Sequence, residues 1–356
     1  MRKIAYFMHI DWGWIKQRPH FLAEELQRYY NLNLFYIKNF KNKGLTQNKG
    51  FNPSFVIYKF PFSSRFKIIH LLEIVFNYFK NKRLYSSEYD TLWITSPLIL
   101  QFVNLDKVPK STKVIYDCMD DMLAFPQSSK TSKYMGDLEE KLINRSDFVF
   151  VSSKTLGEKL NKRGVIKNLY VVNNGIGIIE TQLLKQFKPS KEYFNIFYFG
   201  TIAGWFDFEI LLKILNSQSD VIFTLVGPCE TAMPFHPRLK FLGPVNHSDL
   251  FNCVQNADAF IMPFKVNELV LSVDPVKVYE YLFFNKPCII VKYPETIKFE
   301  KYVYLYSSYD ELHQIILDLI INPVNKTAEK EITDFLQQNT WKKRAETIVR
   351  IMEEKV

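Results

Sequence analysis

Long apolar runs, paired cysteines and a glycine-rich nucleotide fingerprint are all missing from this 356-residue sequence. The four cysteines lie far apart, without the spacing of a zinc site or of a secreted disulfide framework, and we expect buried thiols. No run approaches the roughly 20 apolar residues of a membrane-spanning helix. The apolar part of the N-terminus is too short and too interrupted for a signal peptide. We therefore expect a cytosolic protein.

Three further absences narrow the function. Neither half of the sequence places a G-x-G-x-x-G string between a strand and a helix, which disfavours a dehydrogenase. No D-x-D string occurs in a metal-binding context, so we expect neither a bound metal nor a cofactor. No RNA- or DNA-binding motif accompanies the positive charge, and nucleic acid is not an expected partner.

The length suits two domains of ordinary size, and the composition is that of a globular protein, with 47% hydrophobic and 23% charged residues. Short apolar strands alternate with amphipathic helices through both halves of the chain. This alternation predicts an α/β fold.

The net charge of +9 is concentrated in one region. Residues 36–85 contain a single acid, Glu73, and ten basic residues: Lys38, Lys41, Lys43, Lys49, Lys59, Arg65, Lys67, Lys80, Lys82 and Arg83. The stretch 66–79 would be apolar on nearly every face of a helix. An exposed apolar helix beside basic residues suits an anionic membrane surface. The other interpretation is a buried helix surrounded by solvated lysines.

Residues 259–291 read as one strand–loop–helix–strand unit. An apolar strand, Ala259–Met262, precedes a polar loop that carries Lys265, Asn267, Glu268, Ser272 and Asp274. Pro275 is suited to the start of a helix, Asp274 to its N-cap, and the helix is expected over Val276–Phe284. A second buried strand follows at Cys288–Val291. Open α/β sheets bind ligands beyond the carboxyl ends of their strands, and a helix N-terminus attracts anions, so this loop is a predicted ligand site.

Two other loops join a strand to a helix through glycine. The first strand, Lys3–His9, leads through Gly13 to a helix expected over Phe21–Tyr29, and Arg18 and His20 lie just before that helix. These two side chains either meet an acceptor or phosphate group, or cap and pin the loop. The strand Asn195–Phe199 leads through Gly200 and Thr201 to a helix from Phe208, and glycine allows a ligand to approach the backbone closely.

A strand beginning at Lys113 ends among three carboxylates, Asp117, Asp120 and Asp121. Grouped carboxylates repel one another unless a base role, a cation or a sugar hydroxyl uses them. The alternative is helix capping. We favour chemistry for Asp117 and capping for Asp121, and leave both open for Asp120.

Four strings in these loops resemble one protein family. They are W-x-x-x-R-P-H-x-L-A from Trp14, Y-D-x-x-D-D from Tyr116, Y-F-G-x-x-A-x-W-F-D from Tyr198, and the stretch from Pro263 to Pro287. The sequence is similar to two-domain GT-B glycosyltransferases, in particular the family 4-like enzymes of bacterial cell-surface polysaccharide synthesis, such as the teichuronic acid type. This resemblance implies two Rossmann-like domains facing each other across a cleft. It implies an acceptor domain over 1–177, a linker over 178–192, a nucleotide-sugar domain over 193–338, and a helix over 339–356 that crosses back.

The resemblance also implies roles for individual residues. Glu280 stands where the family holds the ribose of the nucleotide, and the loop up to Val276 and Lys277 holds the diphosphate and the sugar. Many relatives place a glutamate where this sequence has Ser272, so Asp274 or Glu268 takes over sugar contacts. Relatives also carry a basic pair around the glycine loop that is absent here; Lys265 and Lys277 are the substitutes, unless they are solvated surface lysines. Backbone groups around Val245 are expected to meet the base.

Taken together, the resemblance predicts transfer of a sugar from a nucleotide-diphosphate sugar, with UDP the default and GDP next, to a saccharide acceptor that is lipid-linked. It favours the membrane interpretation of residues 36–85 and a peripheral place on the inner face of the cell membrane. Asp117 or Asp120 would act as base in an inverting reaction, although family 4 relatives retain configuration. A sugar-nucleotide 2-epimerase of the same fold and an inactive scaffold subunit are the alternatives.

Overall fold

The computed structural model describes residues 1–38, 51–52, 54–63, 65–80, 88–177, 192–245 and 247–354. The chain folds as two compact units, one of Met1–Asn173 with Trp341–Val356 and the other of Asn174–Thr340. The linker predicted at 178–192 lies outside the described residues except for Glu192. The same holds for five of the ten basic residues noted above: Lys41, Lys43, Lys49, Lys82 and Arg83.

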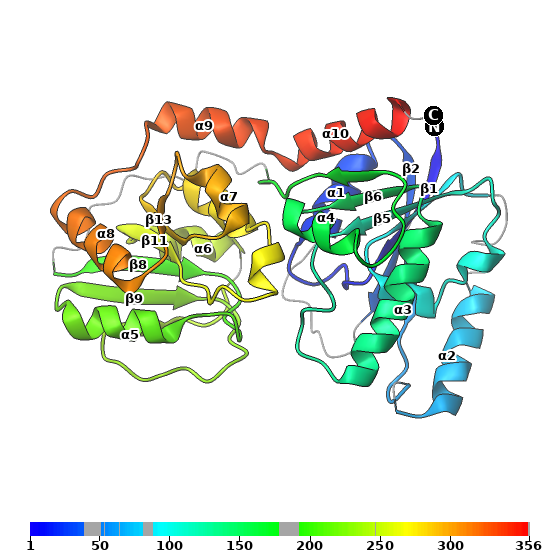
Figure 1. Cartoon of the computed structure of the whole chain (residues 1–356), viewed down its shortest axis with the longest axis horizontal. Helices are drawn as coiled ribbons and strands as arrows, with labels where there is room; N and C mark the ends of the chain where they lie inside the picture. Colours follow the sequence, from blue (N-terminus) through cyan, green and yellow to red (C-terminus); the bar gives the residue numbers. More distant parts are fainter. Residues whose placement is uncertain are drawn as a thin grey trace. The chain divides into compact units, whose positions relative to one another are not determined.

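The first unit is built on a seven-stranded parallel sheet in the order β3-β2-β1-β4-β5-β6-β7 (Figure 1). The strands are β1 (Lys3–Met8), β2 (Asn31–Lys38), β3 (Ser54–Tyr58), β4 (Thr91–Ile94), β5 (Lys113–Cys118), β6 (Phe148–Val151) and β7 (Leu169–Val171). The helices of this unit are α1 (Arg18–Leu26), α2 (Lys67–Lys80), α3 (Ser129–Arg145), α4 (Lys154–Leu160) and α10 (Trp341–Glu354).

The second unit has a six-stranded parallel sheet in the order β10-β9-β8-β11-β12-β13. Its strands are β8 (Phe194–Phe199), β9 (Val221–Val226), β10 (Leu239–Phe241), β11 (Ala259–Met262), β12 (Cys288–Val291) and β13 (Tyr304–Tyr306). Its helices are α5 (Phe208–Ser217), α6 (His247–Val254), α7 (Val276–Phe283), α8 (Tyr309–Ile321) and α9 (Glu329–Gln338). The prediction of an α/β fold is confirmed. The strands expected at Lys3–His9, Asn195–Phe199, Ala259–Met262 and Cys288–Val291 match β1, β8, β11 and β12 to within one residue.

The strand order gives each sheet one point at which the chain reverses its direction of winding. This point lies between β1 and β4 in the first unit and between β8 and β11 in the second. Loops that leave the carboxyl ends of two such strands diverge to opposite faces of the sheet and open a crevice, where ligands of α/β sheets bind. The glycine loops of the sequence follow β1 and β8, so both stand at these points.

Aromatic side chains fill both cores, because strands covered on two faces need apolar residues throughout. In the first unit the Trp93 ring stacks between Tyr6 and Phe150, with centroids 5.6 Å from each. In the second, Phe260 and Tyr281 stack at 4.9 Å and join β11 to α7. No described helix is long and apolar enough to cross a membrane. The four cysteines form no disulfide, and only Cys118 and Cys288 are fully buried.

Helix α1 begins three residues before its predicted start at Phe21. The residue Gln17 is its N-cap, and Pro19 occupies the first turn, where the missing N–H costs no hydrogen bond. The C-terminal helix α10 packs on α1, and the rings of Phe21 and Trp341 stack at 5.1 Å with an interplanar angle of 6°. The end of the chain thereby completes the first unit.

We expect Trp341→Ala to lower the free energy of unfolding of the first unit by about 3–5 kcal/mol, because the indole is buried and its removal leaves a cavity beside α1. Urea unfolding followed by circular dichroism measures the change. The neighbouring exposed Lys342 provides the control, and Lys342→Ala should change the unfolding free energy by less than about 0.5 kcal/mol. Equal stabilities for the two variants would contradict the packing role of Trp341.

Candidate functional site

The glycine loop after β8 is closely packed against its neighbours. Gly200 has a φ of +149°, and a Cβ there would lie 2.9 Å from the Tyr198 hydroxyl oxygen and 3.1 Å from Lys277 Cε. Gly227, after β9, has a φ of +136°, and its Cβ would lie 2.1 Å from the Gly200 carbonyl oxygen. Both positions therefore require glycine. The Thr201 carbonyl oxygen accepts a hydrogen bond of 2.7 Å from the Tyr198 hydroxyl, which fixes the loop to β8.

Two predicted ligand residues lie together beside this loop. Lys277 and Glu280 stand on adjacent turns of α7, and Lys277 Nζ donates to Glu280 Oε2 at 2.7 Å. The Lys277 ammonium also lies 5.2 Å from the centre of the Phe199 ring, the residue before Gly200. Both side chains are partly exposed. The structure thus brings the predicted ribose and diphosphate contacts to one place, at the carboxyl ends of β8 and β11.

Asp274 differs from its prediction. The N-cap of α7 is Pro275, and no side chain caps this helix. The Asp274 carboxylate instead accepts hydrogen bonds from the Asn174 backbone N–H and from Lys298 Nζ, and it is fully buried. The N-cap prediction is wrong because the carboxylate is directed into the unit, where it holds Asn174. Of the two residues predicted to contact the sugar, Asp274 is buried and Glu268 is exposed.

The remaining loop residues divide into structural and exposed groups. Asn267 Oδ1 accepts from the backbone N–H groups of Leu269 and Val270 at 3.1 and 3.0 Å, which starts the short 3-10 helix η5 (Val270–Ser272). Ser272 is buried. Lys265 is exposed, and its Nζ lies 3.6 Å from Glu209 Oε1. Val276, the first residue of α7, and Val245 are each half-buried.

In the first unit Arg18 and Asp117 form a buried ion pair. Arg18 Nε and Nη2 donate to Asp117 Oδ1 at 2.9 and 2.8 Å, and Nη1 donates to the Val172 carbonyl oxygen at 2.6 Å. Both side chains are almost completely inaccessible to solvent. The roles considered for them, phosphate or acceptor binding by Arg18 and base catalysis by Asp117, do not fit this geometry. The pair instead joins α1, β5 and the segment after β7.

His20 pins the loop before α1. Its Nδ1 accepts from the Gln17 backbone N–H at 3.2 Å, and its Nε2 lies 3.2 Å from the Asp11 carbonyl oxygen, to which it donates. The ring is therefore neutral with its proton on Nε2. Burial lowers the pKa of His20 to about 4. Of the two roles considered for this residue, the structure supports the pinning role.

Gly13 lies in the same loop and has no positive φ. Its N–H donates to Asp11 Oδ1 at 3.0 Å, and an added Cβ would make only an ordinary contact of 3.5 Å with that oxygen. The chain itself does not require glycine at this position, in contrast to Gly200.

Asp120 is the carboxylate of the acidic cluster that retains access to solvent. It is half-buried, and its pKa is raised to about 6, chiefly by burial. The charge of Arg18 opposes this rise in pKa, and the charge of Asp121 adds to it. Asp121 is buried, pairs with Arg163 at 2.7 Å and Lys159 at 3.2 Å, and accepts from the Leu123 N–H. Asp121 is thus structural, as favoured from the sequence, and Asp120 has the pKa of a general base near neutral pH.

Sequence reasoning missed His9 and Thr95, which meet at the point of reversal of the first sheet. His9 Nδ1 lies 3.0 Å from Thr95 Oγ1, and that oxygen accepts from the His9 backbone N–H at 3.4 Å. Burial lowers the pKa of His9 to about 4, with a smaller contribution from His20, so the imidazole is neutral. The sequence signal was available, because each residue directly follows a strand, but it needed the strand order to bring the two together.

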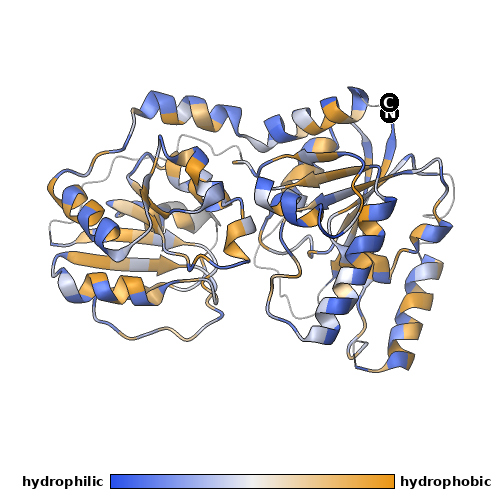
Figure 2. Cartoon of the chain, viewed as in Figure 1, coloured by the Kyte–Doolittle hydropathy of each residue, from blue (hydrophilic) through white to orange (hydrophobic). Residues whose placement is uncertain are grey.

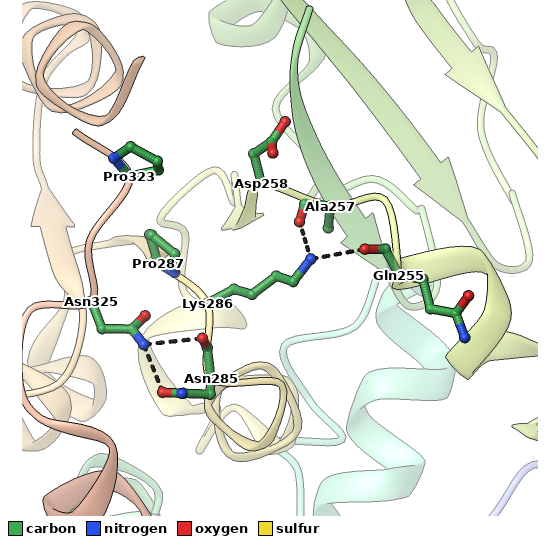
Figure 3. A pocket seen from close by; sticks show the side chains of 8 residues that line it. All are labelled: Gln255, Ala257, Asp258, Asn285, Lys286, Pro287, Pro323 and Asn325. Atoms are coloured by element: carbon green, nitrogen blue, oxygen red, sulfur yellow. Dashed lines mark hydrogen bonds between the residues drawn. The ribbon is translucent and has the colours of Figure 1, made fainter. Parts of the chain in front are cut away.

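The second unit has a pocket around Lys286 (Figure 3), at the opposite end of the strands from the Gly200 loop. It has a volume of about 210 Å³ and stands where β11 and β12 begin, at the amino ends of the strands. Lys286 Nζ donates to the carbonyl oxygens of Gln255 and Ala257, and Asn325 bonds with Asn285. These contacts close the C-terminal end of α6 and fasten the chain near Asn325, which is a structural role. No group of three potential metal ligands occurs among the residues that the structure describes.

Comparison with known proteins supports the fold. The sequence matches no protein-family model. It is 27% identical over 240 residues to a protein of Bacillus subtilis (strain 168) named as a teichuronic acid biosynthesis glycosyltransferase, TuaH; the match covers 60% of this chain and 59% of that protein. The chain therefore spans less than two thirds of that relative.

Solved structures match over nearly the whole chain. HepE of Anabaena in complex with UDP is 16% identical with a TM-score of 0.68, covering 99% of this chain and 100% of that one. A sucrose-phosphate synthase of Thermosynechococcus elongatus is 14% identical with a TM-score of 0.70, covering 99% of each chain. The lipopolysaccharide outer core galactosyltransferase WaaB is 14% identical with a TM-score of 0.69, covering 99% and 100%. This chain has the GT-B fold of two Rossmann-like units.

The neutral state of His20 predicts how stability depends on pH. The unfolded chain binds a proton near the ordinary pKa of about 6.5, whereas the folded chain resists protonation until about pH 4, so folding stability falls as the pH drops through this window. At pH 5 the loss from this residue is about 2 kcal/mol relative to pH 8.

Urea unfolding of the wild-type protein and of His20→Gln at both pH values isolates this contribution, because His9 and Asp120 titrate in both proteins. The stability difference between the two proteins should shrink or reverse at pH 5 by about 2 kcal/mol. A difference that does not change with pH would mean that His20 is not held neutral.

Proposed function

We propose that the protein, which has the GT-B fold, is a glycosyltransferase that moves a sugar from a UDP-sugar to a lipid-linked saccharide acceptor in cell-surface polysaccharide synthesis. The observation that carries this proposal is the placement of Lys277 and Glu280 beside the close-packed Gly200 loop, at the point of reversal of the second sheet. The names of the relatives support it: TuaH is named for teichuronic acid biosynthesis, and HepE has been solved with UDP and with UDP-glucose.

The donor half of the site is suited to a nucleoside diphosphate. The glycine at position 200 leaves no Cβ in the way of a phosphate, and the N-terminus of α7 and the Lys277 ammonium supply positive charge. When a diphosphate draws Lys277 away, the Glu280 carboxylate is left to accept hydrogen bonds from the ribose hydroxyls. The same positive groups stabilise the charge that grows on the departing diphosphate. We therefore propose that transfer proceeds without a metal ion.

Asp120 is the proposed base for the acceptor. In the reaction an acceptor hydroxyl oxygen forms a bond to the anomeric carbon, the bond from that carbon to the phosphate oxygen breaks, and UDP leaves. Asp120 accepts the hydroxyl proton. Direct displacement inverts the anomeric configuration. Retention would require the departing phosphate to accept the proton, and NMR of the product distinguishes the two routes.

The acceptor is proposed to be lipid-linked because of the first unit's surface. Its described part carries exposed basic residues around α2, whose apolar side chains are also exposed. An enzyme acting on a saccharide carried by a membrane lipid must reach a membrane surface, and anionic lipids attract such basic residues. We propose a peripheral position on the inner face of the cell membrane.

Binding of nucleotides tests the donor site. We expect UDP to bind without added magnesium and Glu280→Ala to weaken the affinity by about 1–3 kcal/mol, because a charge-assisted contact to the ribose is lost. Isothermal titration calorimetry with UDP, GDP and NAD measures both effects. Glu300→Ala, which removes an exposed glutamate of the same unit, should leave the affinity unchanged. Binding of NAD alone, or a Glu280→Ala variant with full affinity for UDP, would overturn the assignment.

Asp120→Asn should lower kcat by about 10²–10⁴-fold while the affinity for UDP is preserved, because only the proton acceptor is removed. Wild-type activity should fall as the pH drops below about 6, where Asp120 becomes protonated, and this limb should vanish in the variant. Asp137→Asn on the exposed side of α3 is the matched control. An Asp120→Asn enzyme with normal kcat and the same acid limb would return Asp120 to a structural role. Interconversion of the UDP-sugar without an acceptor would instead identify an epimerase.

A further inference from the structure

Helix α2 has its polarity reversed relative to a helix on the surface of a globular protein. Glu73 and Asn77, one turn apart, are each only 1% exposed. Apolar residues occupy most of the exposed positions and recur at helical spacing: Ile68, Leu71, Leu72, Val75, Phe76 and Phe79. Figure 2 shows the hydrophobic colouring along this helix. A surface helix ordinarily directs its apolar stripe toward the core and its charged residues toward water, so α2 presents the wrong face to solvent for a protein surrounded only by water.

Specific hydrogen bonds hold α2 in this orientation. Asn77 Nδ2 donates to the Tyr58 carbonyl oxygen at 2.9 Å, and Asn77 Oδ1 accepts from the Tyr58 N–H at 3.0 Å. Glu73 accepts from the Phe60 N–H. Rotating the apolar face inward would break these hydrogen bonds and leave partly buried backbone groups of Tyr58 and Phe60 without them. The exposure of the apolar residues is therefore built into the fold.

The apolar surface extends beyond the helix. A groove of about 510 Å³ runs beside α2, lined by Val75, Tyr78 and Phe79 on one side and by Leu100 and Phe102 of the neighbouring segment on another. Contiguous exposed apolar area of this kind marks a site of interaction with a partner or a membrane.

The charged residues that line the groove or stand at the ends of α2 are basic. Arg65 and Lys67 stand at the start of α2 and Lys80 at its end, all exposed, and Lys107 Nζ lies 5.1 Å from the centre of the Tyr78 ring. The only acid of the helix, Glu73, is buried. A second copy of the chain is a poor partner, because a twofold contact through this helix would bring two basic rims together. Apolar side chains bordered by cations match the boundary between acyl chains and headgroups in an anionic bilayer.

We propose that α2 is the membrane-binding element of the protein, that its exposed apolar residues insert into the interface of an anionic phospholipid bilayer, and that the basic residues at its ends bind the headgroups. This inference rests on the proposed function, because it identifies the helix that makes the membrane contact proposed there. It assigns α2 a role that neither the donor site nor Asp120 requires.

Co-sedimentation of the full chain with lipid vesicles tests the proposal. The probes are vesicles of equal parts phosphatidylglycerol and phosphatidylcholine, and vesicles of phosphatidylcholine alone. We expect binding to the mixed vesicles, weakening as salt is added, and little binding to the neutral ones. The triple variant Ile68→Ser, Leu72→Ser, Phe79→Ser should bind mixed vesicles at least about tenfold more weakly. Neutralising Arg65, Lys67 and Lys80 to Gln should reduce binding to the mixed vesicles only.

A matched control replaces three exposed apolar residues elsewhere, Val165, Phe235 and Ile321, by Ser. It should bind vesicles like the wild type. Titration with UDP in the absence of lipid checks that each variant is folded and keeps this test separate from the donor site: a protein that binds vesicles through α2 but not UDP refutes the donor proposal alone.

Three results would overturn the inference. They are failure of the wild type to bind mixed vesicles, equal losses in the α2 variant and in the control, and a dimer in solution that the α2 substitutions dissociate while vesicle binding is absent. The last result would assign the surface to a second copy of the chain.

Discussion

The first unit depends on one buried ion pair. Arg18 and Asp117 are 99 positions apart in sequence, and their contact fixes the start of α1 against the end of β5. Removing two charges from water is costly, and Asp117 Oδ2 accepts no hydrogen bond within the described part of the chain, so the pair fixes geometry more than it adds stability. Loss of one partner would leave the other charge buried and unpaired, which is far more costly than loss of both. The pair thereby positions the loop from Asp117 to Asp120, which carries the proposed base of this unit.

The second unit depends on a constraint of a different kind, which is the lack of side-chain volume. The backbone at Gly200 passes so close to Gly227 that Gly227 has no room for a Cβ, and a Cβ on Gly200 itself, at a φ of +149°, would crowd Tyr198 and Lys277. This close packing presents loop backbone, rather than a side chain, to whatever approaches the carboxyl ends of β8 and β11. Lys277 and Glu280 reach the same position from α7, so backbone and side-chain groups converge without any long-range charge pair.

Much of this could be predicted from the sequence, because it depends on local patterns. Apolar runs gave the strands, and the spacing of three residues between Lys277 and Glu280 was enough to place both side chains on one face of a helix. The roles of Arg18, Asp117 and Asp274 could not be predicted, since each depends on a partner about 100 residues away or on a contact formed only in the folded unit. The pairing of His9 with Thr95 needed the order of the strands. An exposed apolar helix at α2 was one of the two interpretations of the sequence, but the hydrogen bonds of Glu73 and Asn77 to the backbone of Phe60 and Tyr58 could not be predicted.

The side chain of Asn77 reproduces the pairing of a neighbouring strand. One amide group donates to the carbonyl and accepts from the N–H of the same residue, Tyr58, on β3, which is the last strand at its side of the sheet. Open strand edges of this kind allow sheets of different molecules to join and aggregate. Helix α2 covers this edge at Tyr58, where the Asn77 amide makes the hydrogen bonds that the peptide group of another strand would make. The helix whose apolar side chains are exposed therefore also protects the sheet from growing by addition of another chain.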